Sequence, residues 1–380
     1  MAPNGSAPPG RQRAGRTIVT PLLLTPGPLT TDPAVRRAML DDWGSRDPAF
    51  IALTAELRRR LLDVANGGET HVAVPIQGCG TYALEAAAGT LLGADDRLLM
   101  LINGAYGERM AAIATRLGRA VETLRWDENE PVDATVVAAW LAADPAITHV
   151  AFVHVETTTG LLNPLEEVAR VVADAGRLLI VDAMASFGAL PIDLSTLPVA
   201  AILASSNKCL EGTPGLGFAL VDRAVLEGCA GQSASMSLDL HAQWRGFEAN
   251  GQWRFTPPVQ VVAALVEALR RLEAEGGSTS RLARYTGNLA TLLRGTDALG
   301  LDLYLDRSLQ APIIATFRSP DRFDFTTFYD ALAAAEFVIY PGKLTKAESF
   351  RIGCIGAIGP ADFDRLVTAM RPALAAATQG

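Results

Sequence analysis

Residues 178–208 read LLIVDAMASFGALPIDLSTLPVAAILASSNK and contain two wholly apolar runs, each followed at once by polar residues. Strands buried on both faces of a parallel sheet have this unbroken apolar character. The first run, Leu178–Val181, ends at Asp182, and the second, Ala200–Ala204, ends at Ser205-Ser206-Asn207-Lys208. Because such sheets bind ligands at the carboxyl ends of their strands, this stretch predicts a site that contains an acid and a lysine.

On either side of this stretch, the chain repeats a strand, a glycine-containing turn and a helix. Such alternation predicts an α/β fold, with a mostly parallel central sheet covered by helices. A Pro-rich extended segment at 21–28 and helices at 32–40 and 48–65 should come first. Further strands are expected at 71–76, 97–102, 121–124, 149–154 and 217–221, and the helices between them at 82–92, 107–117, 132–142 and 164–175.

A smaller α+β domain is expected after Pro257-Pro258, where a long helix at 259–275 should link the two domains. Beyond it we expect helices at 280–293, 325–335 and 360–376, and strands at 301–305, 313–317, 337–339 and 350–353. The first residues lack the apolar stretch of a signal peptide. The predicted organisation is a disordered tail at 1–19, a large domain at 20–258, and the linking helix with the small domain at 259–380.

Composition argues against several classes of protein. Of the 380 residues, 49% are hydrophobic, which is typical of a folded chain. The formal net charge of −8 argues against a nucleic-acid partner. No apolar stretch approaches the roughly 18 residues of a membrane span. The four cysteines lack metal-binding spacing, so we expect free thiols, a cytoplasmic location and no metal site.

Four features supply groups for chemistry or for anion binding. The turn Gly78-Cys79-Gly80-Thr81 precedes a helix and suits a phosphate, although such turns are equally often structural. Asp182 is a ligand for a cation or a protonated ring nitrogen, or else a helix cap or a structural salt bridge. Lys208, one of three lysines, can form a Schiff base. Arg351, within an apolar strand, binds an anion or forms an interdomain salt bridge.

Together these groups meet the requirements of pyridoxal 5′-phosphate. This cofactor needs a lysine for its aldehyde, an acid for its pyridine nitrogen, a cup for its phosphate and an anchor for the substrate's acid group. Asp182 precedes Lys208 by 26 residues, a span that suits one strand, a connection and another strand.

Longer motifs extend over most of the chain: LLLTPGPLTT (22–31), DWGSRD (42–47), QGCGTYALEA (77–86), NGAYGERM (103–110), HVETTTGLLNP (154–164), VDAMASFGALPID (181–193), SSNKCLEGTPG (205–215), SLDLHAQW (237–244), WRFTPP (253–258) and FVIYPGK with FRIGCIG (337–356). With them the chain resembles the fold-type I pyridoxal-phosphate aminotransferases, in the branch that contains alanine–glyoxylate aminotransferase. Within that branch it is most similar to the 2-aminoethylphosphonate–pyruvate aminotransferases.

The resemblance implies a role for each matching residue. Lys208 would bond the cofactor and shuttle the proton, and Asp182 would pair with the ring nitrogen. Cys79, Gly80 and Thr81 would hold the phosphate. Relatives usually carry serine in place of Cys79, but a backbone N–H serves there regardless.

Further implied contacts concern the ring, the phosphate and the substrate. Around the cofactor they are Tyr106 stacked on the ring, Thr157 on its hydroxyl side, Met184 behind it, Asn207 at the phosphate, and Thr256 with Trp253 at the phosphate of the neighbouring subunit of a homodimer. Arg351 would grip the substrate's acid group. Arg46 is either a second cation for a phosphonate or a solvated arginine at a helix start.

The implied activity is transfer of the amine of 2-aminoethylphosphonate to pyruvate, giving phosphonoacetaldehyde and L-alanine. An alanine–glyoxylate or serine–pyruvate aminotransferase would share every cofactor residue, so these remain alternatives. A cysteine desulfurase usually has histidines where this chain has Tyr106 and Asn207. A relative that has lost catalysis is a further alternative, against which Lys208, Asp182 and Arg351 count.

Overall fold

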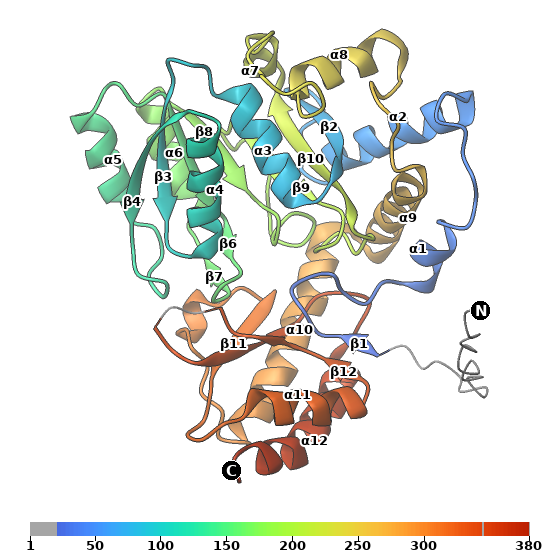
Figure 1. The fold of residues 1–380 in the computed structure, drawn as a ribbon, viewed down its shortest axis with the longest axis vertical. Coiled ribbons are helices and arrows are strands. Elements are labelled where there is room, and N and C mark those ends of the chain that lie inside the picture. Colours follow the sequence, from blue (N-terminus) through green and yellow to red (C-terminus); the bar gives the residue numbers. More distant parts are fainter. Residues whose placement is uncertain (1–20, 344–345, 380) are drawn as a thin grey trace, which may run out of the picture.

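Seven strands form the central sheet of this computed structural model, which describes residues 21–343 and 346–379 (Figure 1). Their order is β2-β10-β9-β8-β5-β3-β4. Only β10 runs antiparallel to its neighbours, so the prediction of a mostly parallel sheet is confirmed. The strands are β2 (His71–Gly78), β3 (Arg97–Ile102), β4 (Ala120–Arg125), β5 (His149–Val153), β8 (Leu178–Asp182), β9 (Ala201–Ser205) and β10 (Gly215–Asp222).

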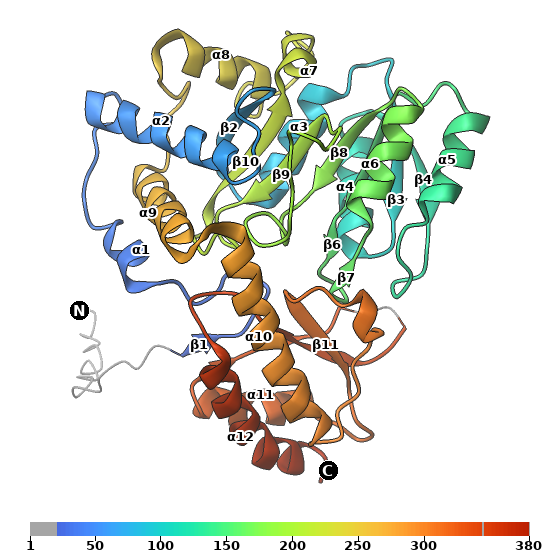
Figure 2. The same ribbon diagram turned by 180° about the vertical axis from the view of Figure 1, so that it is seen from behind.

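Helices cover both faces of this sheet, as the apolar strands require. On one face lie α3 (Gly80–Leu91) and α4 (Ala105–Arg116) (Figure 1). The other face carries α2 (Pro48–Asp63), α5 (Ala134–Ala143), α6 (Leu165–Asp174) and α9 (Val259–Glu275) (Figure 2). Successive residues of β8 alternate between two cores, since Ile180 packs with α3 and α4 whereas Leu179 and Val181 pack on the opposite side.

The C-terminal unit has its own small sheet and core. Antiparallel strands β11 (Ile314–Arg318), β14 (Ser349–Gly353) and β13 (Tyr340–Pro341) pack with α10 (Gly277–Asp297), α11 (Phe325–Ala334) and α12 (Pro360–Ala377). Helix α10 runs from the large sheet into this unit (Figures 1 and 2). Strand β1 (Leu22–Leu23) pairs in parallel with β12 (Phe337–Val338), so the start of the described chain belongs to the C-terminal unit.

Several expected boundaries differ from those observed. Residues 301–305 form no strand, because only Leu303 makes a bridge, to Phe317, before the chain turns into the short helix η1 (Arg307–Leu309). The helix expected at 32–40 is shorter, with α1 spanning Pro33–Arg37.

Three further helical and strand elements were not expected. They are α7 (Arg223–Glu227), α8 (Leu240–Asn250) and the hairpin β6–β7 (Val155–Glu156 and Leu161–Leu162). Helix α8 did carry a sequence signal, since Asp239 caps its start and left-handed Gly251 ends it.

The expected domain boundary at residue 258 stays a prediction. In the structure, α9 packs its apolar face into the same core as α2 and the central sheet. Leu24, near the start of the described chain, packs instead with the C-terminal unit. The predicted tail at 1–19 lies outside the described residues. No helix among the described residues is long and apolar enough to cross a membrane.

The segment after β1 passes closely between the C-terminal unit and the predicted site. Gly353, at the end of β14, donates a backbone hydrogen bond to Leu24, 2.9 Å long. A Cβ added to Gly353 would lie 2.3 Å from the carbonyl oxygen of Thr25. The carbonyl of the next residue, Pro26, accepts a hydrogen bond from Lys208 Nζ. The glycine therefore permits the close approach that brings this segment to the lysine.

We predict that Gly353→Ala destabilises the protein, because the new methyl group meets backbone atoms that cannot move independently. Overpacking of this kind costs about 1–3 kcal/mol of unfolding free energy. Chemical denaturation of the purified variant measures it. Gly68→Ala is the matched control, since a Cβ there meets nothing within 4 Å. Equal stability of the two variants would contradict the prediction.

Candidate active site

The carboxyl ends of the parallel strands surround a cavity of about 180 Å³. It brings together the predicted residues that follow β2, β3, β5, β8 and β9, namely Cys79, Gly80, Thr81, Tyr106, Thr157, Asp182, Met184, Asn207 and Lys208. Gly27, from the segment after β1, and Arg109, from α4, also line it. Because neighbouring parallel strands end at one edge, residues more than 100 positions apart in the chain meet there.

Lys208 follows β9, and its Nζ points to the carbonyl oxygen of Pro26. Within the described ranges, no acidic side chain forms a salt bridge with this amine. Burial lowers the pKa of the Lys208 amine, and the nearby positive charge of Arg351 acts in the same direction. A lysine with a lowered pKa has a larger neutral fraction, which makes it a better nucleophile.

Asp182 is the last residue of β8 and is only 2% exposed. Its Oδ1 accepts a 2.9 Å hydrogen bond from the N–H of Met184. Burial raises the pKa of Asp182 to about 6, and the charge of Glu156 adds to the rise. The carboxyl group forms no salt bridge with any described residue and caps no α-helix, so neither structural alternative accounts for its burial. It is available to a cationic group in the cavity.

Tyr106, at the start of α4, presents its ring to two cations. Arg109 Cζ lies 4.9 Å and Lys343 Nζ 5.2 Å from the ring centroid. Burial alone would raise the pKa of the Tyr106 phenol, but a hydrogen bond with Thr157 and the charges of Lys208, Lys343 and Arg351 lower it overall. The phenol therefore lies in a strongly positive field.

Glu156, which our sequence reasoning missed, holds Tyr106 in place. Its buried carboxylate accepts hydrogen bonds from the N–H groups of Tyr106 and Gly107, 3.1 and 3.4 Å long, and from Thr158. Burial raises the pKa of Glu156 despite these bonds. An acid at the start of a helix satisfies N–H groups that have no partner within the helix. Its place in HVETTTG, just beyond a buried strand, was the available signal.

The turn after β2 leaves free donors at the start of α3. Cys79 is the N-cap residue, and its exposed side chain makes no capping hydrogen bond. The N–H groups of Gly80 and Thr81 precede the first intrahelical hydrogen bonds, so they can bind an anion. A Cβ on Gly80 would come within 2.5 Å of the Met184 sulfur. The glycine thus preserves space beside the cavity.

Arg351 is buried in β14, but its guanidinium is not neutralised. Nε donates to the Pro341 carbonyl and NH1 to the Thr157 carbonyl, both at 3.0 Å. Within the described part of the chain it forms no ion pair, so the alternative of an interdomain salt bridge does not hold. Arg351 does not line the cavity directly, but it contacts Thr157, which does. Its remaining donors are available to an anion.

Three predicted residues lie away from the cavity of this chain. Trp253 donates from Nε1 to Thr54 and packs edge-to-face on Phe247, so its polar atom is already occupied. This argues against its predicted phosphate contact. Thr256 and Arg46 are exposed and do not line the cavity.

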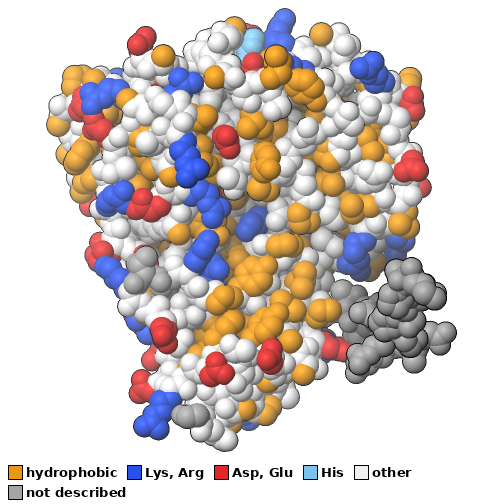
Figure 3. Space-filling model, viewed as in Figure 1, with side chains coloured by type: hydrophobic (Ala, Val, Ile, Leu, Met, Phe, Trp, Pro, Cys, Tyr) orange, Lys and Arg blue, Asp and Glu red, His pale blue; other side chains and the backbone are white. Residues whose placement is uncertain are grey.

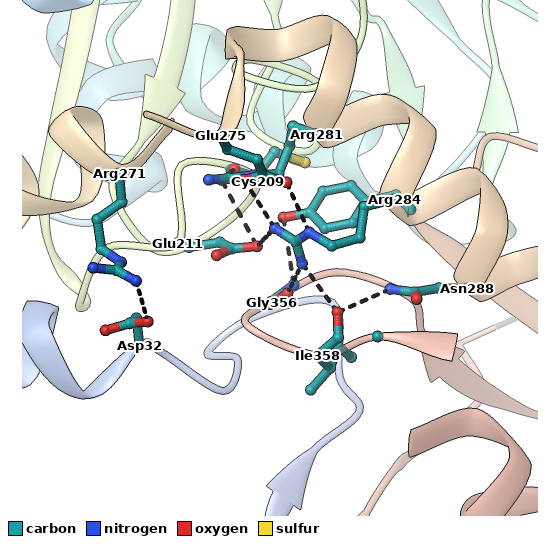
Figure 4. A network of polar contacts seen from close by, with 12 residues as sticks. Asp32, Cys209, Glu211, Arg271, Glu275, Arg281, Arg284, Asn288, Gly356 and Ile358 are labelled. Atoms are coloured by element: carbon teal, nitrogen blue, oxygen red, sulfur yellow. Dashed lines mark hydrogen bonds and ion pairs between the residues drawn. The ribbon is translucent and has the colours of Figure 1, made fainter. Parts of the chain in front are cut away.

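A buried charge network holds the turn that carries Lys208 (Figure 4). Arg281, in α10, donates to the carbonyl of Cys209, the residue after the lysine, at 2.6 Å. Glu211, left-handed at φ 59°, accepts from Arg284 and Tyr285. The network continues through Glu275 at the end of α9, and Arg284 also binds the carbonyls of Gly356 and Ile358. One network thus links the lysine turn to both structural units.

Comparisons with known proteins agree with this geometry. Residues 44–317 match the model of the aminotransferase class-V family. The chain is 50% identical over 356 residues to a 2-aminoethylphosphonate–pyruvate transaminase of Pseudomonas putida (strain GB-1), covering 93% of this chain and 97% of the relative. It is also 50% identical to the 2-aminoethylphosphonate–pyruvate transaminase 2 of Polaromonas sp. (strain JS666), covering 93% and 95%.

Solved structures with the same fold include two further aminotransferases. The alanine–glyoxylate aminotransferase of Nostoc sp. superposes with a TM-score of 0.89 at 28% identity, covering 96% of this chain and 97% of that one. The pyridoxamine–pyruvate aminotransferase of Mesorhizobium loti superposes with a TM-score of 0.87 at 26% identity, covering 96% and 95%. The expected fold class is thereby confirmed.

We predict that Arg281→Met lowers the unfolding free energy by about 1.5–3 kcal/mol, because a charge-assisted hydrogen bond to the buried Cys209 carbonyl is lost. Denaturant titration gives the value. Arg307→Met is the matched control, since Arg307 forms an exposed ion pair with Asp297 that is worth at most about 1 kcal/mol. A loss for Arg281→Met no larger than the control's would show that the network does not stabilise the turn.

Proposed function

Since this chain belongs to the class-V aminotransferase family, we propose that it transfers the amino group of 2-aminoethylphosphonate to pyruvate. The products would be phosphonoacetaldehyde and L-alanine. The observation that carries the proposal is the cavity itself, which Lys208 and Asp182 line, each without an ionic partner among the described residues. The unneutralised Arg351 contacts Thr157, another residue of the same cavity. Half of the aligned residues are identical to those of transaminases named for this reaction.

The enzyme depends on pyridoxal 5′-phosphate, and the residues present fit that cofactor. The cofactor supplies an aldehyde that bonds amines and a ring that accepts electrons. Lys208 offers an amine of lowered pKa, and the free N–H groups at the start of α3 offer a seat for a phosphate. Asp182 would hold a proton on the ring nitrogen, because a carboxylate beside a cation gains stability in a buried site.

Other residues of the cavity would orient the ring and the phosphate. Tyr106 would stack on one face of the ring, with Thr157 near its hydroxyl side and Met184 behind it. Asn207, beside the lysine, would contact the phosphate. Glu156 would keep the start of α4, and with it Tyr106, in position.

Lys208 would also move the proton on which the reaction depends. Once released from its bond to the cofactor, Nζ would be a free amine able to take a proton from the amine-bearing carbon of the donor. In the second half of the reaction, the same atom would deliver a proton to the carbon of pyruvate that becomes the amine-bearing carbon of alanine. The lowered pKa of Lys208 favours the neutral form required for the first of these transfers.

Arg351 would bind the acid group of each substrate in turn. Its two backbone contacts fix the plane of the guanidinium, and its remaining donors suit a phosphonate or a carboxylate equally well in geometry. This shared anchor explains how one site accommodates a phosphonate donor and a carboxylate acceptor.

We predict that 2-aminoethylphosphonate is the best amine donor in a panel that also contains serine and other amino acids, with pyruvate as acceptor and alanine as the product measured. Lys208→Ala should abolish turnover, because the covalent anchor and the proton carrier go together. Borohydride reduction and peptide mapping should place the pyridoxyl group on Lys208. Preference for serine, or for alanine with glyoxylate, would favour the alternative aminotransferase activity instead.

We propose that the protein works as a homodimer in which Thr256 contacts the cofactor phosphate of the neighbouring subunit. Thr256 is exposed and follows Phe255, an apolar side chain that is 43% exposed. Met236, 71% exposed, receives a hydrogen bond at its carbonyl from Arg254 and so lies near the same segment. Exposed apolar side chains beside a polar one suit the surface of a twofold dimer.

Thr256→Val should weaken cofactor binding by about 0.5–1.5 kcal/mol, or up to about 3 if its hydrogen bond is charge-assisted, while the chain still folds. Cofactor titration measures the dissociation constant, and sedimentation gives the mass in solution. Thr135→Val, at an exposed threonine on α5, is the control and should leave cofactor affinity unchanged. A fully active monomer would rule out the shared site.

A cytoplasmic location remains part of the proposal. All four cysteines are free thiols, and three of them are buried in the structure. Burial raises the pKa of the Cys209 thiol to about 12 and that of Cys229 to about 11, so these two are poor nucleophiles. Unpaired cysteines of this kind are typical of a reducing compartment.

A further inference from the structure

We propose that Lys343 is the second cation of the acid-group site and favours a phosphonate dianion over a carboxylate. The inference rests on the proposed function, because it concerns the donor of that reaction. Arg351 supplies one positive charge, whereas a fully ionised phosphonate carries two negative charges. Arg46 was the sequence-based candidate for the second charge, but no hydrogen bond, ion pair or ring contact joins it to a described residue of the cavity. Lys343 is also exposed and outside the cavity lining, but it contacts the ring of Tyr106, a residue of the cavity.

Lys343 contacts Tyr106, a residue of the cavity whose phenol also lies near the charge of Arg351. Its Nζ lies 5.2 Å from the ring centroid of Tyr106, which lines the cavity. It follows β13 by two residues, and the Pro341 carbonyl at the end of that strand accepts the hydrogen bond from Arg351 Nε. Lys343 and Arg351 therefore belong to one hairpin and approach Tyr106 from the C-terminal unit.

The electrostatics around Tyr106 support this placement. The charges of Lys343 and Arg351 both lower the pKa of the Tyr106 phenol. Arg109 adds a third cation over the ring at 4.9 Å. It comes from α4 and lines the cavity, where its charge also acts on Asp182, so it belongs to the cofactor side.

None of the three cations has an acidic partner among residues 21–343 and 346–379. By contrast, Lys346, only three residues beyond Lys343, forms a 2.6 Å ion pair with Asp127 on the surface. Figure 3 shows Lys and Arg side chains gathered over α4 and toward the C-terminal unit. A group of like charges without counter-charge is unfavourable until an anion binds. The arrangement is therefore suited to an anion of more than one charge.

The size of the effect follows from the charge of the substrate. At a given distance, the Coulomb energy of one cation with a dianion is twice that with a monoanion. Loss of Lys343 should reduce kcat/KM for a carboxylate by some factor. Because kcat/KM depends exponentially on energy, the reduction for the phosphonate should be the square of that factor. For an exposed cation such as Lys343, roughly tenfold and roughly threefold are the expected factors.

Steady-state kinetics of Lys343→Met in the cofactor-loaded enzyme test the proposal. Each half-reaction has its own kcat/KM, so the donor and pyruvate are measured separately. We expect kcat/KM for 2-aminoethylphosphonate to fall about tenfold and that for pyruvate about threefold, with Lys343→Arg restoring most of the loss. In wild type, the ratio of kcat/KM for 2-aminoethylphosphonate to kcat/KM for pyruvate should fall as the pH is lowered, because the phosphonate takes up a proton. In Lys343→Met the same ratio should fall less.

Lys346→Met is the matched control and should match wild type for both substrates, because its charge is already paired with Asp127. Equal loss for both substrates, or none for the phosphonate, would overturn the role of Lys343 while leaving the proposed function intact. A wild-type enzyme that does not use 2-aminoethylphosphonate would instead overturn the proposed function and, with it, this inference.

Discussion

Asp182, at the end of β8, and Lys208, three residues beyond β9, lie in one cavity without a salt bridge between them, and the rest of the site depends on this constraint. Strand β8 is apolar up to Asp182 and β9 up to Ser205, and Lys208 follows in the next turn, so neither charge finds an ion-pair partner in the sheet. Burial raises the pKa of the acid and lowers that of the lysine. Both shifts favour the neutral forms of these groups, whereas a ligand of complementary charge stabilises their charged forms.

Keeping the lysine in that position requires support from distant parts of the chain. Pro26, in the segment after β1, accepts a hydrogen bond from the Lys208 amine. Arg281 donates a hydrogen bond to the carbonyl of Cys209, the residue after the lysine. Arg284 binds both Glu211 and the backbone beyond β14 (Figure 4). The lysine turn and the strand that carries Arg351 are thus attached to one helix, α10. In the proposed function, a substrate held by Arg351 would thereby lie at a defined distance from the Lys208 amine that takes its proton.

The anion-binding side of the site has the opposite electrostatic character from the protein as a whole. The net charge is −8, yet Arg351, Lys343 and Arg109 surround Tyr106 without acidic partners among the described residues. A local positive field of this kind attracts anions whatever the overall charge. Arg46, the sequence-based candidate for a second cation, is exposed and does not line the cavity, so its contact with substrate stays a prediction.

The parallel sheet could be predicted from the sequence alone, because it depends on local patterns. Unbroken apolar runs indicate strands buried on both faces, and strand–helix alternation indicates that they are parallel. It also determined the residues at the strand ends, since parallel strands necessarily end at one edge. The missing strand at 301–305 shows the limit of this reasoning, because pairing depends on a partner elsewhere.

Only the tertiary structure revealed Glu156 beneath α4, the Arg281 network and the place of Lys343. These contacts join residues far apart in the chain, as with Lys343 and Tyr106, which are 237 positions apart, and no periodicity in the sequence predicts them.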